Sequence, residues 1–218
     1  MTGQHSCARC GGPVRAPGLW SNAWRCAEHG DTDPVSPVGL PVHDRIAKDV
    51  QGSRVPFWMP WPLPAGWLAT GLTWAGDERH GARAGLIACA GPNPLGGFSE
   101  LLVIAEEPGV GLGSHWAGMP GLDPGPSLST TTGPHAKVTV AGHPTALWCV
   151  DGEPDRAVYV GEANAMWLWL IIWPAGAGAL VHDNLTFVDL REAPRDLQIP
   201  LGALSTRLTA GATRAPHS

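Results

Sequence analysis

The chain has 218 residues, of which 44% are hydrophobic and 15% are charged, and its formal net charge is −5. This balance excludes a wholly disordered chain and provides enough apolar material for one domain with a small appendage. The 29 glycines and 22 prolines disfavour long helices, so turns and short strands are expected instead.

The distribution of charge argues against a nucleic-acid interface. Residues 1–33 contain three arginines and three acidic residues, whereas residues 55–190 contain twelve acidic and four basic residues. A nucleic-acid binder needs a basic face to meet the phosphates, and neither segment provides one. We therefore expect no nucleic-acid partner.

The N-terminus and the longest apolar run both favour a cytoplasmic protein. Residues 1–6 are polar and contain no apolar signal core, and the apolar run Ala165–Trp173 is ended by Pro174. A run of that length is too short to span a bilayer. We expect a soluble cytoplasmic protein with no membrane partner, whose cysteines stay reduced and available to a metal.

The first 33 residues contain a pattern typical of a zinc site: Cys7-x2-Cys10, fifteen residues, then Cys26-x2-His29. Zn²⁺ prefers four sulfur or imidazole ligands in a tetrahedron, and two short hooks joined by a hairpin supply them. We predict one structural Zn²⁺ held by Cys7, Cys10, Cys26 and His29. The alternatives are a redox pair at the first two cysteines, four unrelated residues, or His5 as a ligand.

The segment between the hooks predicts a short hairpin and resembles a zinc ribbon. Val14–Ala16 and Trp24–Cys26 are its expected strands, and Gly11 and Gly30 suit the tight turn that follows each hook. Four protein ligands leave no open position, which disfavours zinc-based hydrolysis. Because so short a segment has little core of its own, metal removal should unfold residues 1–33 and leave the body folded.

The rest of the chain predicts a β-rich fold, all-β or α+β, with a mainly antiparallel body after the ribbon. Residues 34–54 are expected to form a proline-containing linker with a short helix at Val42–Val50, residues 55–208 the β-rich domain, and residues 209–218 a disordered tail. The body should contain strands at Trp67–Ala75, Ala82–Cys89, Phe98–Glu106, Ala136–Ala141, Thr145–Val150, Ala157–Val160, Ala165–Trp173, Ala179–His182 and Leu185–Leu190. Residues 107–135, rich in Gly and Pro, should form a long loop.

Two glycine-rich segments suggest phosphate loops, but their details favour turns. Gly91–Gly97 lacks the Lys-Ser/Thr ending and contains Pro92 and Pro94, which remove amide donors. The Gly109-x-Gly111-x-Gly113 segment does not open a predicted helix, which disfavours a dinucleotide site.

Other reactive side chains have structural interpretations that we weigh first. Cys149 and His143 would lie roughly 20 Å apart on a continuous strand, so a nucleophile–base pair is disfavoured and both Cys89 and Cys149 are expected in the core.

Carboxylates in or beside apolar runs can mark a site, because burying one is costly unless it is paired. Glu100 and Glu162 are the candidates, with Arg83 and Arg156 as possible partners, and strand ends facing water are the alternative. The adjacent acids at residues 106–107 are expected to be solvated.

The aromatic residues are expected to build the core, with an apolar groove as the alternative. Trp167, Trp169 and Trp173 share odd parity, so a strand places their rings on one face. A proline-rich stretch carrying Phe57, Trp58, Trp61 and Trp67 would lie across that core.

Three segments carry a resemblance to a known family. They are Cys-x-x-Cys-Gly-Gly with Arg-Ala-Pro-Gly-Leu-Trp in residues 7–20, Val-Pro-Phe-Trp-Met-Pro-Trp-Pro-Leu-Pro-Ala-Gly-Trp at 55–67, and Trp-Leu-Trp-Leu-Ile-Ile-Trp-Pro at 167–174. The chain resembles an uncharacterised actinobacterial family with an N-terminal zinc ribbon, over most of residues 5–208. Members often carry an automatic phosphotransacetylase label, and the resemblance implies no catalytic residues.

Two functional hypotheses remain open. The first is a cytoplasmic, non-catalytic protein whose β-rich domain binds a protein partner or a small apolar ligand. The second is an enzyme acting on a phosphorylated or acyl small molecule, which would need His80, His115, His135 or His182 to meet Glu100 or Glu162 in a pocket. The sequence indicates no oligomeric state.

Overall fold

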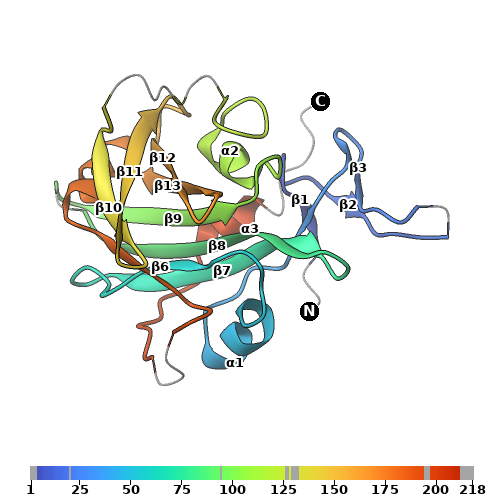
Figure 1. The fold of residues 1–218 in the computed structure, drawn as a ribbon, viewed down its shortest axis with the longest axis horizontal. Coiled ribbons are helices and arrows are strands. Elements are labelled where there is room, and N and C mark those ends of the chain that lie inside the picture. The colour runs from blue at the N-terminus through green and yellow to red at the C-terminus, as the bar shows by residue number, and fades with distance from the viewer. Residues whose placement is uncertain are drawn as a thin grey trace.

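The fold is β-rich and mainly antiparallel, as the sequence predicts (Figure 1). The computed structural model describes residues 4–19, 21–93, 95–125, 128, 133–193 and 197–211. Within these residues most strands belong to one large sheet, and three short strands near the N-terminus form a second sheet. No helix in the described part of the chain combines the length and apolar character needed to cross a bilayer.

In the described residues the large sheet has eleven strands, and neighbours are antiparallel except for β10 and β14, which are parallel. Their order is β1 (Ser6–Cys7), β5 (Pro34–Val35), β7 (Leu68–Asp77), β8 (Gly81–Pro92), β9 (Phe98–Glu106), β13 (Met166–Trp173), β12 (Ala157–Ala163), β11 (His143–Val150), β10 (Ala136–Val140), β14 (Thr186–Asp189) and β6 (Trp58–Pro60). The second sheet has the order β2 (Val14–Arg15), β3 (Arg25–Cys26) and β4 (Gly30–Asp31).

The large sheet curls, so that its last strand, β6, packs back against β8 and β9. Figure 1 shows β10 and β11 standing steeply across the direction of β7–β9. The curled sheet encloses a core that includes Phe57, Trp58, Trp67 and Phe187, all at most 3% exposed. The prediction that the aromatic, proline-rich stretch packs on the core is confirmed for Phe57, Trp58 and Trp67, whereas Trp61 is partly exposed.

The opposite face of the central strands carries a second core. Trp169 and Trp173 of β13 are buried there, and Trp167 packs against the same cluster, so the predicted one-sided arrangement of these rings is confirmed. Helices α2 (Leu112–Ala117) and α3 (Thr206–Gly211) cover this face through Leu112 and Leu208. Uniformly apolar runs such as β13 therefore reflect a sheet covered on both faces.

Most predicted strands are observed, and two predictions in the body, one strand and one loop, differ from the structure. The run Ala179–His182, predicted as a strand, belongs to the 3₁₀ segment η3 (Ala175–His182), and residues 107–135 are not only loop because they contain α2. A short apolar run fits a buried helix as well as a strand, which explains the first error.

The ends of the predicted domains also differ from the structure. Within the expected linker, α1 (His43–Arg45) and the π-helical η1 (Ile46–Val50) confirm the predicted helix, but Pro34–Val35 is strand β5 of the large sheet. Residues 209–211, assigned to a disordered tail, belong to α3, because the Ser205 hydroxyl accepts a hydrogen bond from the Leu208 amide and Leu208 is buried. Residues 212–218 of that predicted tail lie outside the described residues.

Candidate metal centre

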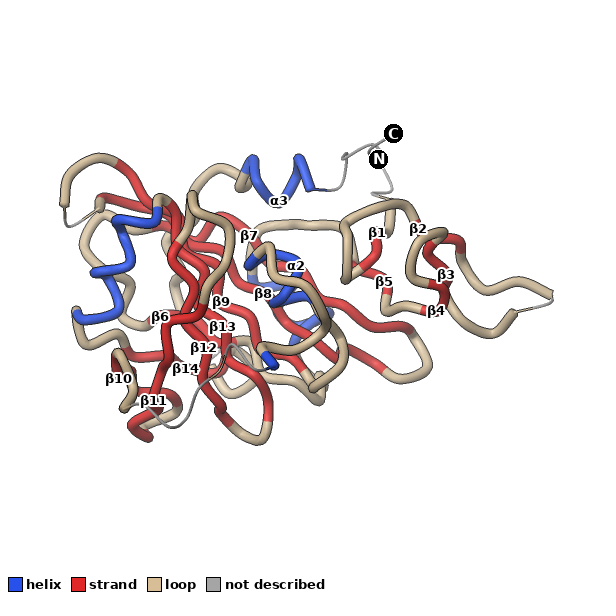
Figure 2. The backbone as a smooth tube through the Cα atoms, turned by 90° about the horizontal axis from the view of Figure 1, so that it is seen from above, coloured by secondary structure: helices blue, strands red, loops and turns tan. Residues whose placement is uncertain are grey.

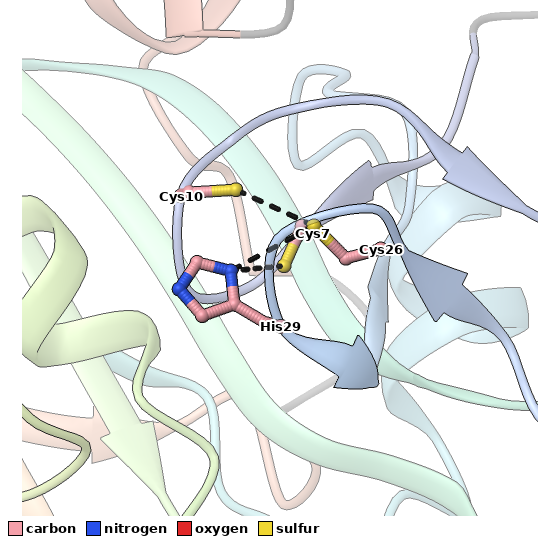
Figure 3. A group of neighbouring side chains, drawn as sticks. All are labelled: Cys7, Cys10, Cys26 and His29. Atoms are coloured by element: carbon pink, nitrogen blue, oxygen red, sulfur yellow. Dashed lines mark hydrogen bonds between the residues drawn. The ribbon is translucent and has the colours of Figure 1, made fainter. Parts of the chain in front are cut away.

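The four predicted ligands converge on one point near the N-terminus (Figure 3). The Sγ atoms of Cys7, Cys10 and Cys26 and a ring nitrogen of His29 all lie within 4.8 Å of one another. The Cys10 and Cys26 sulfurs are 3.7 Å apart, and His29 Nδ1 lies 3.7 Å from Cys26 Sγ and 3.9 Å from Cys7 Sγ. The group could hold one metal ion.

Two tight turns and the predicted hairpin place these side chains. Val14 of β2 pairs with Cys26 of β3, which confirms the hairpin between the hooks. Gly11 and Gly30 have φ values of 70° and 66°, in the left-handed region where glycine carries no steric penalty. The Gly11 amide donates to the Cys7 carbonyl at 2.8 Å, which closes the first hook.

Backbone amides and burial set the acidity of the thiols. Burial by itself raises the pKa of the Cys26 thiol, but hydrogen bonds from the Glu28 backbone and from His29 outweigh it and lower the pKa to about 7. At Cys10 burial dominates and raises the pKa to about 12, with the charge of Cys7 acting in the same direction. Amide donors aimed at sulfur favour the thiolate, which is the form that binds a metal.

His5, the alternative ligand, is not part of the group. Its ring packs on Trp24 with centroids 4.8 Å apart and an interplanar angle of 48°. Of these two histidines, it is His29 that belongs to the group of converging side chains.

The ribbon is joined to the body at several points, and Figure 2 shows β2–β4 at one end of the molecule beside β1 and β5. β1, which contains Cys7, pairs with β5, and β5 pairs with β7 through Val35 and Ala75. Arg83 of β8 adds a polar link, because its guanidinium binds Asp33 at 3.0 Å and Glu107 at 2.8 Å. Burial raises the pKa of Asp33, and the Arg83 charge acts against that rise.

The histidines considered for an enzyme site lie on different elements in the described part of the chain. His80 pairs with Asp77 in an exposed turn at 3.0 Å, and the His135 ring accepts a hydrogen bond from the Cys149 amide. His115 lies on α2 next to Trp116, and His182 is exposed at the end of η3.

The two candidate carboxylates also have structural surroundings. Glu100 binds Arg207 at 3.1 Å and the Ser205 hydroxyl, while Glu162 is exposed on β12. The partners expected for these carboxylates were wrong. Arg83 binds Asp33 and Glu107, and Arg156 binds Asp155. Glu100 instead pairs with a cation of the α3 helix.

The cysteines outside the ribbon differ from each other. Cys89 is fully buried in the enclosed core, as predicted, and burial raises the pKa of its thiol. Cys149 was predicted to be in the core but is exposed near the end of β11, although Leu147, on the same face of the strand, is buried. β11 is continuous from His143 to Cys149, so these two do not form the disfavoured pair.

The glycine-rich segments behave as local structural elements. The Asn93 amide donates to the Gly97 carbonyl in the turn that joins β8 to β9, as predicted; Pro94 of that segment lies outside the described residues. The segment ending at Gly113 does open a helix, contrary to the prediction, since Gly111 caps the N-terminus of α2.

Glu106 is the residue that sequence reasoning missed. It was expected to be solvated, yet it is 0% exposed, and its Oε2 accepts hydrogen bonds from the Leu112 and Gly113 amides at 2.8 and 3.2 Å. Burial raises the pKa of this carboxyl to about 8, against the amide donors, which lower it. The sequence feature that could have indicated its burial is its position at the end of an uninterrupted apolar run, just before the Gly-rich segment.

Comparison with known proteins yields one match. No curated protein and no solved structure matches the chain. One family model, described as a family of unknown function (DUF6758), matches residues 1–208. Because this match covers nearly the whole length, the chain belongs to that family.

Proposed function

We propose that this protein binds one structural Zn²⁺ through Cys7, Cys10, Cys26 and His29 and serves as a non-catalytic binding protein. The observation that carries the proposal is the convergence of the four ligand atoms within 4.8 Å. Three thiols and one imidazole form a donor set typical of structural zinc sites.

The separations fit a tetrahedral zinc ion. Zn–S bonds of about 2.3 Å and Zn–N bonds of about 2.0 Å place neighbouring ligand atoms roughly 3.5–3.8 Å apart in a regular tetrahedron. Three of the six separations, at 3.7, 3.7 and 3.9 Å, are close to that spacing, and all six lie within 4.8 Å. Four protein ligands complete the coordination, so the ion would order the ribbon rather than activate water.

The binding role is supported by where the other reactive groups lie. His80, His135 and Glu100 each have a local partner, and the partners are different. An enzyme acting on a phosphorylated or acyl substrate, the second hypothesis, would need such groups to share one pocket. A protein partner or a small ligand fits better, and the neutral ribbon and acidic body disfavour nucleic acid.

The expected compartment is the cytoplasm. A thiolate site of this kind requires reduced cysteines, and none of the five cysteines forms a disulfide in the structure.

Metal analysis of the purified protein tests the proposal directly. We expect one equivalent of zinc per chain, lost in Cys26→Ser and retained in the matched control Cys149→Ser, whose thiol lies outside the cluster. Thiol titration provides a second readout: the native protein should expose Cys149 alone, and a chelator should add three reactive thiols while Cys89 stays protected. A purified wild-type protein without zinc, or equal zinc content in the Cys26→Ser and Cys149→Ser variants, would refute the proposal.

A further inference from the structure

A groove of about 870 Å³ lies where the ribbon meets the body. Most of its lining comes from the ribbon, the α1–η1 segment with the turn after it, and the end of β7 with the turn that follows, and Pro34, Ser36 and Pro37 complete it. This volume is in the range of small-molecule sites, which measure roughly 300–1,000 Å³. The groove exists only because the ribbon is docked, since His5, Pro17, Asn22 and Trp24 supply one wall.

Aromatic rings from both parts of the protein line this groove. Trp24 of the ribbon is half-buried and contacts the His5 ring, which also lines the groove, with ring centroids 4.8 Å apart. Trp74 of β7 is likewise half-buried and lines the groove from the side of the body. Half-buried tryptophans offer a flat apolar face to a planar ligand while their packing keeps them in place.

Most charges in the lining are already paired within the protein. Arg45 binds Asp49 at 3.3 Å, and Asp77 accepts hydrogen bonds from the His80 ring and from the Arg79 backbone amide. The hydrogen bonds at Asp77 outweigh its burial and lower the pKa of its carboxyl, so this acid is fully ionised and satisfied near neutral pH.

The remaining lining charges are unpaired and favour an anion. Among the residues that the structure describes, the side chains of Lys48, Arg79 and Glu78 have no ion-pair or hydrogen-bond partner, and all three are exposed. Lys48 lies on the η1 wall and Arg79 on the β7–β8 turn, so two free cations from different walls outnumber one free acid. A ligand with an acidic group would gain a charge partner that the protein does not supply.

We propose that this groove binds a small molecule that joins a planar ring to an acidic group, either a carboxylate or a phosphate. The ring packs against Trp24 and Trp74, and the acid meets Lys48 and Arg79. The inference rests on the proposed function, because the proposed Zn²⁺ would hold the ribbon wall in place. The Thr32 hydroxyl lies 3.2 Å from Cys7 Sγ, and the Thr32 amide donates to the Trp24 carbonyl, which connects the metal site to the groove in two steps.

Calorimetric titration of the full, zinc-analysed chain tests this site with defined probes. Adenosine 5′-monophosphate carries a ring with a phosphate, and indole-3-acetate carries a ring with a carboxylate. Adenosine and indole-3-acetamide are their counterparts without the acidic group, and inorganic phosphate lacks the ring. We expect at least one of the two acids to bind saturably and its neutral counterpart to bind about tenfold more weakly. Whichever of the two acids binds shows whether the groove prefers a phosphate or a carboxylate.

Charge-reversal variants locate the site. Lys48→Glu combined with Arg79→Glu should weaken binding of the acidic probe about tenfold or more, whereas Lys137→Glu, an exposed lysine on β10, should leave it unchanged. Failure of both acids to bind, equal binding of the neutral counterparts, or unchanged affinity in the double variant would overturn the inference. If any of these results is obtained with a protein that contains one zinc per chain, the groove proposal fails and the proposed zinc site stands. Absence of zinc from the purified protein would refute the proposed zinc site independently.

Discussion

The buried carboxyl of Glu106 makes a pH-dependent contribution to stability that can be predicted from its surroundings. The side chain is 0% exposed, and burial raises the pKa of its carboxyl from 4.5 to about 8. The folded protein therefore binds this proton more tightly than the unfolded chain does. The stabilisation is complete below the unfolded-state pKa and is lost as the pH rises through about 8.

The magnitude follows from the width of that interval. Each pKa unit corresponds to about 1.4 kcal/mol, so the free energy of unfolding should fall by at most about 4 kcal/mol between pH 5 and pH 8 because of this residue. Glu106→Gln removes the titration and keeps a carbonyl oxygen that can accept from the Leu112 and Gly113 amides. The variant should therefore lose most of this pH dependence without losing the fold.

Guanidinium unfolding followed by tryptophan fluorescence, at intervals between pH 5 and pH 9, measures the effect. The wild-type curve should slope downward with pH relative to Glu106→Gln, and Glu162→Gln, an exposed acid on β12, should follow the wild type. Glu106→Ala should instead be destabilised at every pH, because it leaves two amide donors without their acceptor, at about 1–3 kcal/mol each. Parallel curves for wild type and Glu106→Gln would refute the reasoning.

Two further predictions concern packing and metal removal. A Cβ at Gly113 would lie 2.2 Å from Trp169 Nε1, so Gly113→Ala should lower the unfolding free energy by about 2–3 kcal/mol, whereas Gly176→Ala, in open space, should change it little; equal effects on thermal unfolding would contradict this. Chelation should make amides of residues 1–33 exchange freely with deuterium while β9 and β13 stay protected, and loss of protection throughout the sheet would show that the body cannot fold without the metal.

The parts of the molecule that the sequence predicts well are those set by local pattern. The spacing of Cys7, Cys10, Cys26 and His29 predicts that these side chains converge, because each hook is a turn of a few residues. Uniform apolar runs such as Leu101–Ala105 of β9 specify strands because both faces of the sheet are covered. In both cases the signal lies within one short segment.

The parts that could not be predicted depend on contacts between distant segments. Glu106 is buried because α2 packs over it. The α2 helix is too short to show an amphipathic repeat, so the sequence does not predict this helix. Glu100 binds Arg207, 107 positions away, and nothing in either local pattern indicates that pair. β5 lies in a proline-rich segment that favours a linker, and it becomes a strand through pairing with β1 and β7.

The double role of Cys7 bears on how separate the ribbon and the body are. Its thiol belongs to the metal group, while its backbone belongs to β1 and pairs with Pro34 of the large sheet. Ordering of this residue by a metal ion must then favour the β1–β5 pairing, and through Val35 and Ala75 the edge of β7. Because Trp74 sits next to that pairing and lines the groove, metal binding and ligand binding should be positively coupled. The boundary at residue 33, drawn from proline content, therefore divides two segments that share one sheet.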